Sequence, residues 1–525
     1  MLYIGVDLGT SAVKLLLMDE EGKIRNIVSK EYPLFFPHPG WSEQRPQDWF
    51  EQSMEGIREL TEECDKEEVA GISFGGQMHG LVALDKDDNV IRPAILWNDG
   101  RTGEETDYLN RVIGKERLSA YTANIAFAGF TAPKILWMKK HEPENFGKIS
   151  KIMLPKDYLA YKLSGSFCTD VSDASGMLLM DVKNRRWSEE MLDICGITKA
   201  QLPALHESYE VVGTLRPGIA EELGLPKSVK VIAGAGDNAA AAVGTGTVGE
   251  GRCNISLGTS GTIFISSKKF GVDEHNALHS FAHADGNYHL MGCMLSAAAC
   301  NKWWSEEILK SKDFAAEQSG ITRLGENHVF YLPYLMGERS PHNNPDARAM
   351  FIGMSMDTTR EDMTQAVLEG VTFGLRDSLE VARSIGIQIE RTKICGGGAQ
   401  KPAVEEDHRK CDEHERRCDR ERGRTGAWRG HAGGSGLQSL PGCGDDRQKT
   451  GKSSRYGRTR FGTGGKIRGK VSEVPEDISY GEGIILREFW RWRRQCLGEI
   501  HAPSPRAVRQ FPQFPQIPNS IPHFL

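Results

Sequence analysis

The chain has 525 residues, of which 26% are charged and 39% hydrophobic, with a formal net charge of −6. This length predicts two or more domains with large cores, and the mildly acidic charge excludes a general attraction to nucleic acid or to a membrane surface. No apolar run is long enough to span a bilayer, the sequence opens on a strand pattern instead of a signal peptide, and the 11 cysteines form no C-x-x-C pair, so we expect a cytoplasmic protein with reduced thiols.

The first predicted elements are two strands joined by a tight turn. An apolar run from Leu2 leads through Asp7 into Gly9, Thr10 and Ser11, and a second apolar run covers residues 13–18. A turn of this composition offers N–H groups and hydroxyls to a phosphate because no bulky side chain blocks the approach. The carboxylate beside it could hold a hydrated Mg²⁺. The pattern alone also fits an ordinary β-hairpin, so its role depends on the later segments.

Residues 1–248 are predicted to form one α/β domain. Apolar runs predict strands at 69–74, 81–84, 95–96 and 229–233, and helical segments are indicated at 49–61, 131–140 and 239–243. Polar or glycine-rich segments follow three of the strands, at Gly75–Gly80, Trp97–Arg101 and Gly234–Asn238.

Residues 249–400 are predicted to form a second domain that repeats the opening pattern. Strands at 253–257 and 262–266 flank the turn Gly258–Gly261, which indicates an internal duplication with a phosphate-compatible hairpin in each half. The clearest helix covers 360–385, with small residues on one face, and a strand at 393–395 leads into Gly396–Ala399. Residues 401–525 differ in character, being first dense in charge and then rich in Gly, Pro and Gln, which predicts a disordered tail.

Read together, these segments resemble the FGGY carbohydrate kinases. The turn at Asp7–Thr10, the turn at Gly258–Gly261 and the triple glycine at 396–398 resemble the nucleotide-binding motifs of the wider superfamily of sugar kinases, actin and heat-shock chaperones. The FGGY family itself is indicated by the motifs Gly40–Gln44, Gln77–Gly80, Trp97–Arg101, Ser172–Gly176 and Gly236–Ala239. The resemblance runs from residue 1 to about 399 and is strongest to members that act on D-xylulose.

The resemblance implies two ribonuclease-H-like α/β domains with a cleft between them, and phosphorylation of the D-xylulose 5-hydroxyl by ATP and Mg²⁺. It implies that Asp237 is the general base and, with Asp7, a metal-side acid. The chemistry supports this, since a carboxylate at a helix N-terminus can accept the proton of a poorly nucleophilic sugar hydroxyl. The alternative for Asp237 is a helix N-cap.

The resemblance also assigns the remaining site residues. Sugar binding is expected from Gln77, Met78, His79, Trp97 and Asn98, because a Trp face packs on the C–H side of a sugar while His and Asn bond its hydroxyls. The expected nucleotide contacts are Gly9, Thr10, Ser11, Lys14, Gly258, Thr259, Gly397 and Gly398. The segment Glu338–Pro341 resembles a family loop to which we assign a structural role. The expected partners are sugar and ATP, without nucleic acid or membrane, and a homodimer is compatible with this reading.

The chain departs from the family pattern after Ala399. The family continues there with a helix, a strand, a Gly-Pro-Gly-x-Gly-Gly-Ala loop and a closing helix, which residues 400–525 lack. One permitted back-translation of Arg424–Gly434, read one base later, gives G-P-G-H-G-G-A-M-L-A. The same shift gives a family-type amphipathic helix from residues 450–479, and then the codons of residues 484–485 can contain a stop. We infer a one-base insertion near Ala399 or Gln400.

The inferred insertion also explains two motif-like stretches in residues 401–525. The His and Cys residues between 408 and 418 fit no usual zinc spacing, and the basic, Trp-containing tract at 487–494 is explained by the wrong frame instead of nucleic-acid binding. We expect a stable first domain, an unstable second domain and weak or absent activity. The alternatives are a related kinase for gluconate, ribulose or glycerol, a sugar-binding pseudokinase, and a chaperone-like or actin-like module, against which the sugar-side motifs argue.

Overall fold

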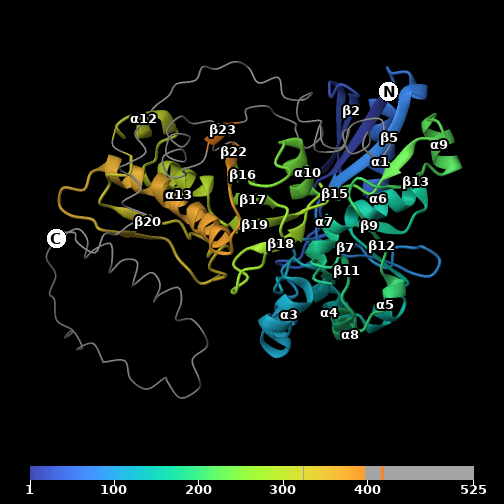
Figure 1. The fold of residues 1–525 in the computed structure, drawn as a ribbon, viewed down its shortest axis with the longest axis horizontal. Helices are drawn as coiled ribbons and strands as arrows, with labels where there is room; N and C mark the ends of the chain where they lie inside the picture. The colour runs from blue at the N-terminus through green and yellow to red at the C-terminus, as the bar shows by residue number, and fades with distance from the viewer. Residues whose placement is uncertain (323, 397–414, 419–525) are drawn as a thin grey trace. The chain divides into compact units, whose positions relative to one another are not determined.

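The computed structural model describes residues 1–322 and 324–396, and the backbone of 415–418. These residues form two large mixed β-sheets, each accompanied by helices (Figure 1), and five two-stranded sheets. The inferred frame change and the nucleotide contacts of Gly397 and Gly398 lie outside the described residues, as does the predicted disordered tail apart from residues 415–418. Those four residues form strand β23 beside β22 (Arg391–Cys395), so the prediction of disorder is wrong there, because their backbone pairs with the edge of the second sheet. Within the described part of the chain, no helix combines the length and the apolar character needed to cross a membrane.

The first sheet has the order β13-β14-β5-β1-β2-β3, with β15 also paired to β5. Its antiparallel part starts with the predicted hairpin of β1 and β2 and continues into β3, whereas β5, β14 and β15 run parallel to β1. The bounds are β1 Leu2–Leu8, β2 Ala12–Asp19, β3 Ile24–Glu31, β5 Val69–Gly76, β13 Val211–Thr214, β14 Lys230–Ile232 and β15 Ala235–Gly236.

Helix α1 (Pro46–Leu60) packs against β2 and β3. It begins with a proline, whose fixed φ and missing N–H suit the first helical position, and it buries Trp49, Met54 and Ile57 in the core of the first sheet. Helix α10 (Asp237–Gly244) starts directly after β15, and α6 (Pro155–Ser164) contacts β5 and β14. The predicted segments at 49–61 and 131–140 are confirmed as α1 and α4 (Thr131–His141).

The second sheet has the order β18-β19-β17-β16-β22-β23. Its bounds are β16 Arg252–Leu257, β17 Gly261–Ser267, β18 His279–Ala282, β19 Tyr288–Met294, β22 Arg391–Cys395 and β23 Glu415–Cys418. Helix α13 (Arg360–Ser384) contacts β17 and β19 (Figure 1). It carries the predicted apolar face into the core of this sheet.

Shorter elements complete the described chain. The helices are α2 Gly103–Asp107, α3 Lys115–Thr122, α5 Pro143–Gly147, α7 Val171–Ala174, α8 Glu189–Cys195, α9 Pro217–Leu223, α11 Ala298–Lys302 and α12 Phe314–Gln318. The strands are β4 Glu43–Gln44, β6 Val82–Leu84, β7 Ala94–Ile95, β8 Lys151–Met153, β9 Cys168–Asp170, β10 Met180–Asp181, β11 Arg186–Trp187, β12 Ala204–His206, β20 Phe330–Leu332 and β21 Met350–Ile352.

The two sheets share one topology. In each, a hairpin continues into a third antiparallel strand, and the first hairpin strand has a parallel neighbour, β5 in one sheet and β22 in the other. The predicted hairpin in each half is therefore confirmed. One boundary differs, because Gly75 and Gly76 continue β5 instead of starting a loop. The domain boundary at residue 248 stays a prediction.

Candidate active site

Three parallel strands of the first sheet end at one edge. Leu8 of β1 and Gly236 of β15 are both register partners of Gly76, the last residue of β5. Because the carboxyl ends of parallel strands meet at the same edge, the residues that follow, which are Gly9, Gln77 and Asp237, gather there. The Gln77 N–H donates to the Leu8 carbonyl at 2.8 Å, and its Nε2 donates to the Gly9 carbonyl at 3.4 Å.

The hairpin places a carboxylate and an ammonium side by side. Asp7 and Lys14 are register partners on β1 and β2, so both side chains stand on the same face of the sheet. The Tyr32 hydroxyl donates to the Gly9 carbonyl, and burial together with the Asp7 charge raises the pKa of that phenol. The phenol therefore stays protonated and fixes the turn.

Trp97 lies against the hairpin turn. Its Nε1 donates to the Thr10 hydroxyl at 3.0 Å, while 47% of the Trp97 side chain remains exposed. Gln44, which the sequence analysis did not assign to the site, donates from Nε2 to the Thr10 carbonyl at 2.7 Å and accepts from Gln77 Nε2 at 3.0 Å. The predicted sugar-side and phosphate-side residues thus touch, and Trp97 keeps an open face beside them. Ser11 and Asn98 are both exposed.

A buried ion network holds the loop that carries Trp97 and Asn98. Arg101 binds both carboxylate oxygens of Asp99 at 2.7 and 2.8 Å and also pairs with Glu43 at 2.7 Å. Its guanidinium lies 3.7 Å from the centre of a Trp41 ring. In the sequence analysis, Asp99 and Arg101 served only to identify a family motif and their positioning role was missed, although an Asp and an Arg two residues apart in a polar turn were the available signal.

His79 is held in an unusual backbone conformation. Its φ is +68°, and its carbonyl accepts from Lys134 Nζ at 2.8 Å and Thr131 Oγ1 at 3.1 Å. Its Nδ1 lies 2.8 Å from the Gly176 carbonyl, where any side chain on Gly176 would approach the imidazole to 2.3 Å. Burial, reinforced by the charges of Lys134 and Arg339, lowers the pKa of His79 to about 3. The imidazole is therefore neutral near pH 7.

This burial predicts acid sensitivity. Burial also lowers the pKa of His279 and His289, so all three imidazoles stay neutral in the folded chain at pH values where the unfolded chain binds protons. The unfolded state then holds more protons, and the free energy of unfolding should fall as pH drops below about 6.5, by up to about 1.4 kcal/mol per pH unit per histidine. Urea unfolding at pH 7.5, 6.5 and 5.5 measures this slope.

The control uses matched histidines. His289→Phe removes one buried titrating group stacked on Phe264, so its slope should be shallower, while His275→Phe at an exposed position should leave the slope unchanged. A free energy of unfolding that does not change between pH 7.5 and 5.5 would contradict the prediction.

Asp237 is the first residue of α10, with Gly236 in the N-cap position. The alternative that Asp237 is the N-cap is therefore wrong. Its Oδ1 accepts from the Asn238 N–H at 2.6 Å and from Asn238 Nδ2 at 2.9 Å. Met78 packs on Gly236 so closely that a side chain there would meet its sulfur at 2.8 Å. The Asp237 carboxylate therefore lies in the first turn of α10, at the end of β15.

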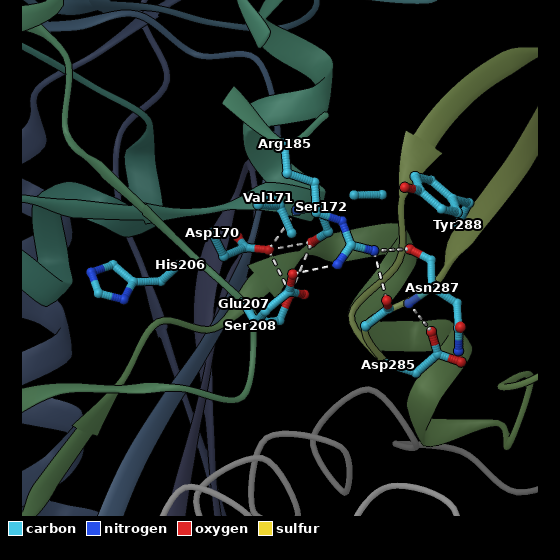
Figure 2. Close-up of polar contacts among 12 residues, drawn as sticks. Asp170, Val171, Ser172, Arg185, His206, Glu207, Ser208, Asp285, Asn287 and Tyr288 are labelled. Atoms are coloured by element: carbon cyan, nitrogen blue, oxygen red, sulfur yellow. Dashed lines mark hydrogen bonds and ion pairs between the residues drawn. The ribbon is translucent and has the colours of Figure 1, made fainter. Parts of the chain in front are cut away.

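A buried polar network supports the strand end before Asp237. The Gly236 N–H donates to Ser172 Oγ at 3.2 Å. Ser172 and Ser208 both donate to Asp170 Oδ2, at 2.5 and 2.6 Å (Figure 2). Asp170 in turn pairs with Lys156 at 2.8 Å. Sequence reasoning placed Ser172 in a family motif but did not foresee this support.

Arg185 joins this region to the second sheet. Figure 2 shows it between Glu207 and Asn287, and its guanidinium binds the Glu207 carboxylate at 2.5 Å and the carbonyls of Gly286 and Asn287 at 2.6 and 2.9 Å. One cation therefore links loops of both halves.

The second hairpin carries Gly258 and Thr259. Their carbonyls accept from the N–H groups of Ala297, Ala298 and Ala299 at 3.0–3.2 Å, which ties the turn to the start of α11. Both residues are exposed. Gly396 directly follows β22 with a φ of +93°, and a side chain there would meet the Leu257 carbonyl at 2.4 Å, so this position requires glycine.

The acids and hydroxyls of the first half fit a hard cation. Mg²⁺ is usually bound by one or two carboxylates together with phosphate oxygens, and Asp7, Asp237 and the hydroxyls of Thr10 and Ser11 supply oxygen donors only. Across the described residues, the group of three metal-ligating side chains close together is Glu104, Glu105 and His141, on α2 and α4. The site edge is thus suited to a metal that arrives with a nucleotide.

Comparisons with known proteins agree along most of the chain. The models for the FGGY family of carbohydrate kinases match residues 2–244 (N-terminal domain) and 253–405 (C-terminal domain). Xylulose kinase of Escherichia coli is 41% identical over 402 residues, covering 76% of this chain and 82% of the relative, and that of Bacillus subtilis is 39% identical over 402 residues, covering 76% and 80%.

Solved structures show the same fold. A protein described as a xyloylose kinase from Brucella ovis is 38% identical with a TM-score of 0.81, covering 85% of this chain and 92% of its own. Gluconate kinase from Lactobacillus acidophilus, at 24% identity and a TM-score of 0.83, covers 95% and 98% and bears on the fold alone. These neighbours confirm the predicted two-part sugar-kinase architecture.

Proposed function

Because this chain belongs to the FGGY family of carbohydrate kinases, we propose that it phosphorylates the 5-hydroxyl of D-xylulose, using ATP and Mg²⁺. The relatives named xylulose kinase support the choice of sugar within the family. The observation that carries the proposal is the meeting of Gly9, Gln77 and Asp237 at one edge of the sheet, with Trp97 against the turn. A cytoplasmic location and a homodimer belong to the same proposal.

In the proposed reaction, Asp237 accepts the proton of the sugar hydroxyl as the phosphoryl group arrives. The neutral His79 and Asn98 hydrogen-bond other hydroxyls, while Trp97 packs on the C–H face of the sugar. Asp7 holds the metal side, and Thr10, Ser11 and Lys14 donate to the phosphates. Bound ATP and Mg²⁺ would supply the phosphoryl group and neutralise its charge; Gly258 and Thr259 contact the nucleotide from the second half.

An ADP-release assay across D-xylulose, ribulose, gluconate and glycerol tests the proposal. D-xylulose is expected to give the highest kcat/KM, and a higher value for another sugar would point to a sister kinase. Calorimetry of the full chain with each sugar alone adds a readout that needs no turnover. Sugar binding without any phosphorylation, both in this chain and in a chain with the restored frame, would favour the pseudokinase.

The inferred frame change predicts a nucleotide-side defect. The family match ends at residue 405, close to the inferred insertion near residue 399. Deleting one base near the codon of that residue would restore the alternative reading frame. We expect the protein made from the corrected gene to have a kcat/KM for ATP about tenfold higher or more, because a tenfold change needs only about 1.4 kcal/mol of recovered binding free energy. The Kd for D-xylulose should change little. Equal kcat/KM for ATP in both chains would contradict the inferred impairment.

A further inference from the structure

The segment Glu338–Pro341, to which the sequence analysis gave a structural role, presents one arginine from a rigid base. The buried Glu338 carboxylate accepts from the N–H groups of Leu295 and Arg339 at 2.9 and 2.8 Å, and the Ser340 N–H donates to the Cys293 carbonyl at 3.0 Å. The segment is thus anchored to the end of β19, and the backbone of Arg339 is fixed.

The Arg339 side chain reaches an aromatic group that includes His79. Its guanidinium carbon lies 5.1 Å from the centre of the Phe127 ring. Phe127 is 5.5 Å from Phe130 and 5.0 Å from His279, and Phe130 is 4.7 Å from the His79 ring. Residues of both halves therefore surround the histidine that the sugar site contains.

Hydrogen bonds between the halves keep this group together. The Asn124 side chain donates to the Ser280 carbonyl at 2.9 Å and accepts from the Ser280 N–H at 3.2 Å. Asn276 Nδ2 donates to the Ala123 carbonyl at 3.1 Å, and Asn343 Nδ2 donates to the Asn276 carbonyl at 3.0 Å. The residues just before Phe127 and the residues just after Arg339 are thus both tied to the loop before β18, through Asn276.

The guanidinium of Arg339 makes no hydrogen bond or ion pair to any residue that the structure describes, and the side chain is half-buried. Its charge contributes to the lowered pKa of both His79 and His279, which keeps a second positive charge away from the guanidinium. A half-buried guanidinium with five donors, which lies over an aromatic face and senses the charge of Glu338 without a side-chain hydrogen bond, can donate to acceptor oxygens of a ligand.

We propose that Arg339 is a specificity-determining residue of the sugar site, donating two hydrogen bonds to the C1 hydroxyl and C2 carbonyl oxygens of a ketose. The inference rests on the proposed function, which places the reacting 5-hydroxyl at Asp237. From Gln77 at the edge of the first sheet, the chain continues through Met78, which packs on Gly236, to His79, whose ring contacts the Gly176 carbonyl. The carbonyl end of the sugar then faces His79 and Arg339, and the planar fork of a guanidinium suits a pair of neighbouring oxygens.

Calorimetry of the full chain with D-xylulose, 1-deoxy-D-xylulose and xylitol tests this role without requiring turnover. Arg339→Gln is expected to raise the Kd for D-xylulose about ten- to a hundredfold, the range for losing hydrogen bonds from a charged donor. The Kd for xylitol and 1-deoxy-D-xylulose, which lack the carbonyl or the C1 hydroxyl, should rise much less, so the preference for D-xylulose disappears. Arg348→Gln, at an exposed position of the same connection between β20 and β21, should bind like the unmodified chain.

The outcomes separate the two proposals. An unmodified chain that binds none of these sugars overturns both. An unmodified chain that binds D-xylulose, with unchanged affinity and preference in Arg339→Gln, overturns the role of Arg339 and leaves the proposed function standing. Thermal melting verifies folding, and if Arg339→Gln does not fold, Arg339→Lys replaces it: lysine keeps the charge but lacks the fork, so a retained preference for D-xylulose would overturn the inference.

Discussion

Replacing Asp237 with asparagine is expected to lower kcat for D-xylulose phosphorylation about 10²- to 10⁴-fold, the usual contribution of a general base. Asparagine keeps the size of the side chain and its place at the start of α10 but cannot accept the proton of the hydroxyl. The Kd for D-xylulose should stay within a few-fold, because Trp97 and His79 are untouched. Rapid-quench single-turnover assays measure the rate of phosphoryl transfer, and calorimetry measures the Kd for D-xylulose.

The control is Asp193→Asn, which removes an exposed carboxylate on α8 and should leave kcat unchanged. If the unmodified chain proves too slow to assay, the same pair of variants in the frame-restored chain serves. A pseudokinase would give sugar binding without turnover in every variant. Residual phosphorylation near the unmodified rate in Asp237→Asn would refute the assignment of the base.

Local patterns were enough to predict the strands and turns of this site. The hairpin at residues 2–19, the strand ending at Gly76 and the helix beginning near Asp237 follow from apolar runs that stop at glycine or acid. The resemblance then grouped segments far apart in sequence, and the parallel register of β1, β5 and β15 confirms that they end together.

The supporting contacts could not be predicted, because they depend on distances that no local pattern encodes. The bond from Gln44 to the Thr10 carbonyl and the pairing of Arg101 with Glu43 join separate segments. The position of Arg339 against Phe127 depends on how the second half meets the first. A sequence gives the residue types for such contacts but not the partner.

Lys156 is expected to have a large effect on the free energy of unfolding instead of on the reaction rate. Its fully buried Nζ lies 2.6 Å from Asp157, 2.8 Å from Asp170 and 3.7 Å from Asp173. Burial raises the pKa of Asp157 and Asp173, although the positive charge of Lys156 opposes this rise. Burial also lowers the pKa of Lys156, but the three carboxylates raise it by more, so the pKa of the lysine is raised overall. One cation therefore holds together an acidic interior directly behind the strand that leads to Asp237.

Replacing Lys156 with methionine should lower the free energy of unfolding by about 3–5 kcal/mol, the cost of leaving buried charge unpaired. In the variant, the remaining carboxylates would be protonated more readily in the folded than in the unfolded chain, so the folded state binds more protons. The loss of unfolding free energy should therefore grow from pH 6 to pH 8. Urea unfolding at both pH values measures it. Lys140→Met, which breaks an exposed pair with Glu104, should have little effect at either pH. Equal losses in the two variants, or a loss that shrinks toward pH 8, would contradict a buried cluster held by one lysine.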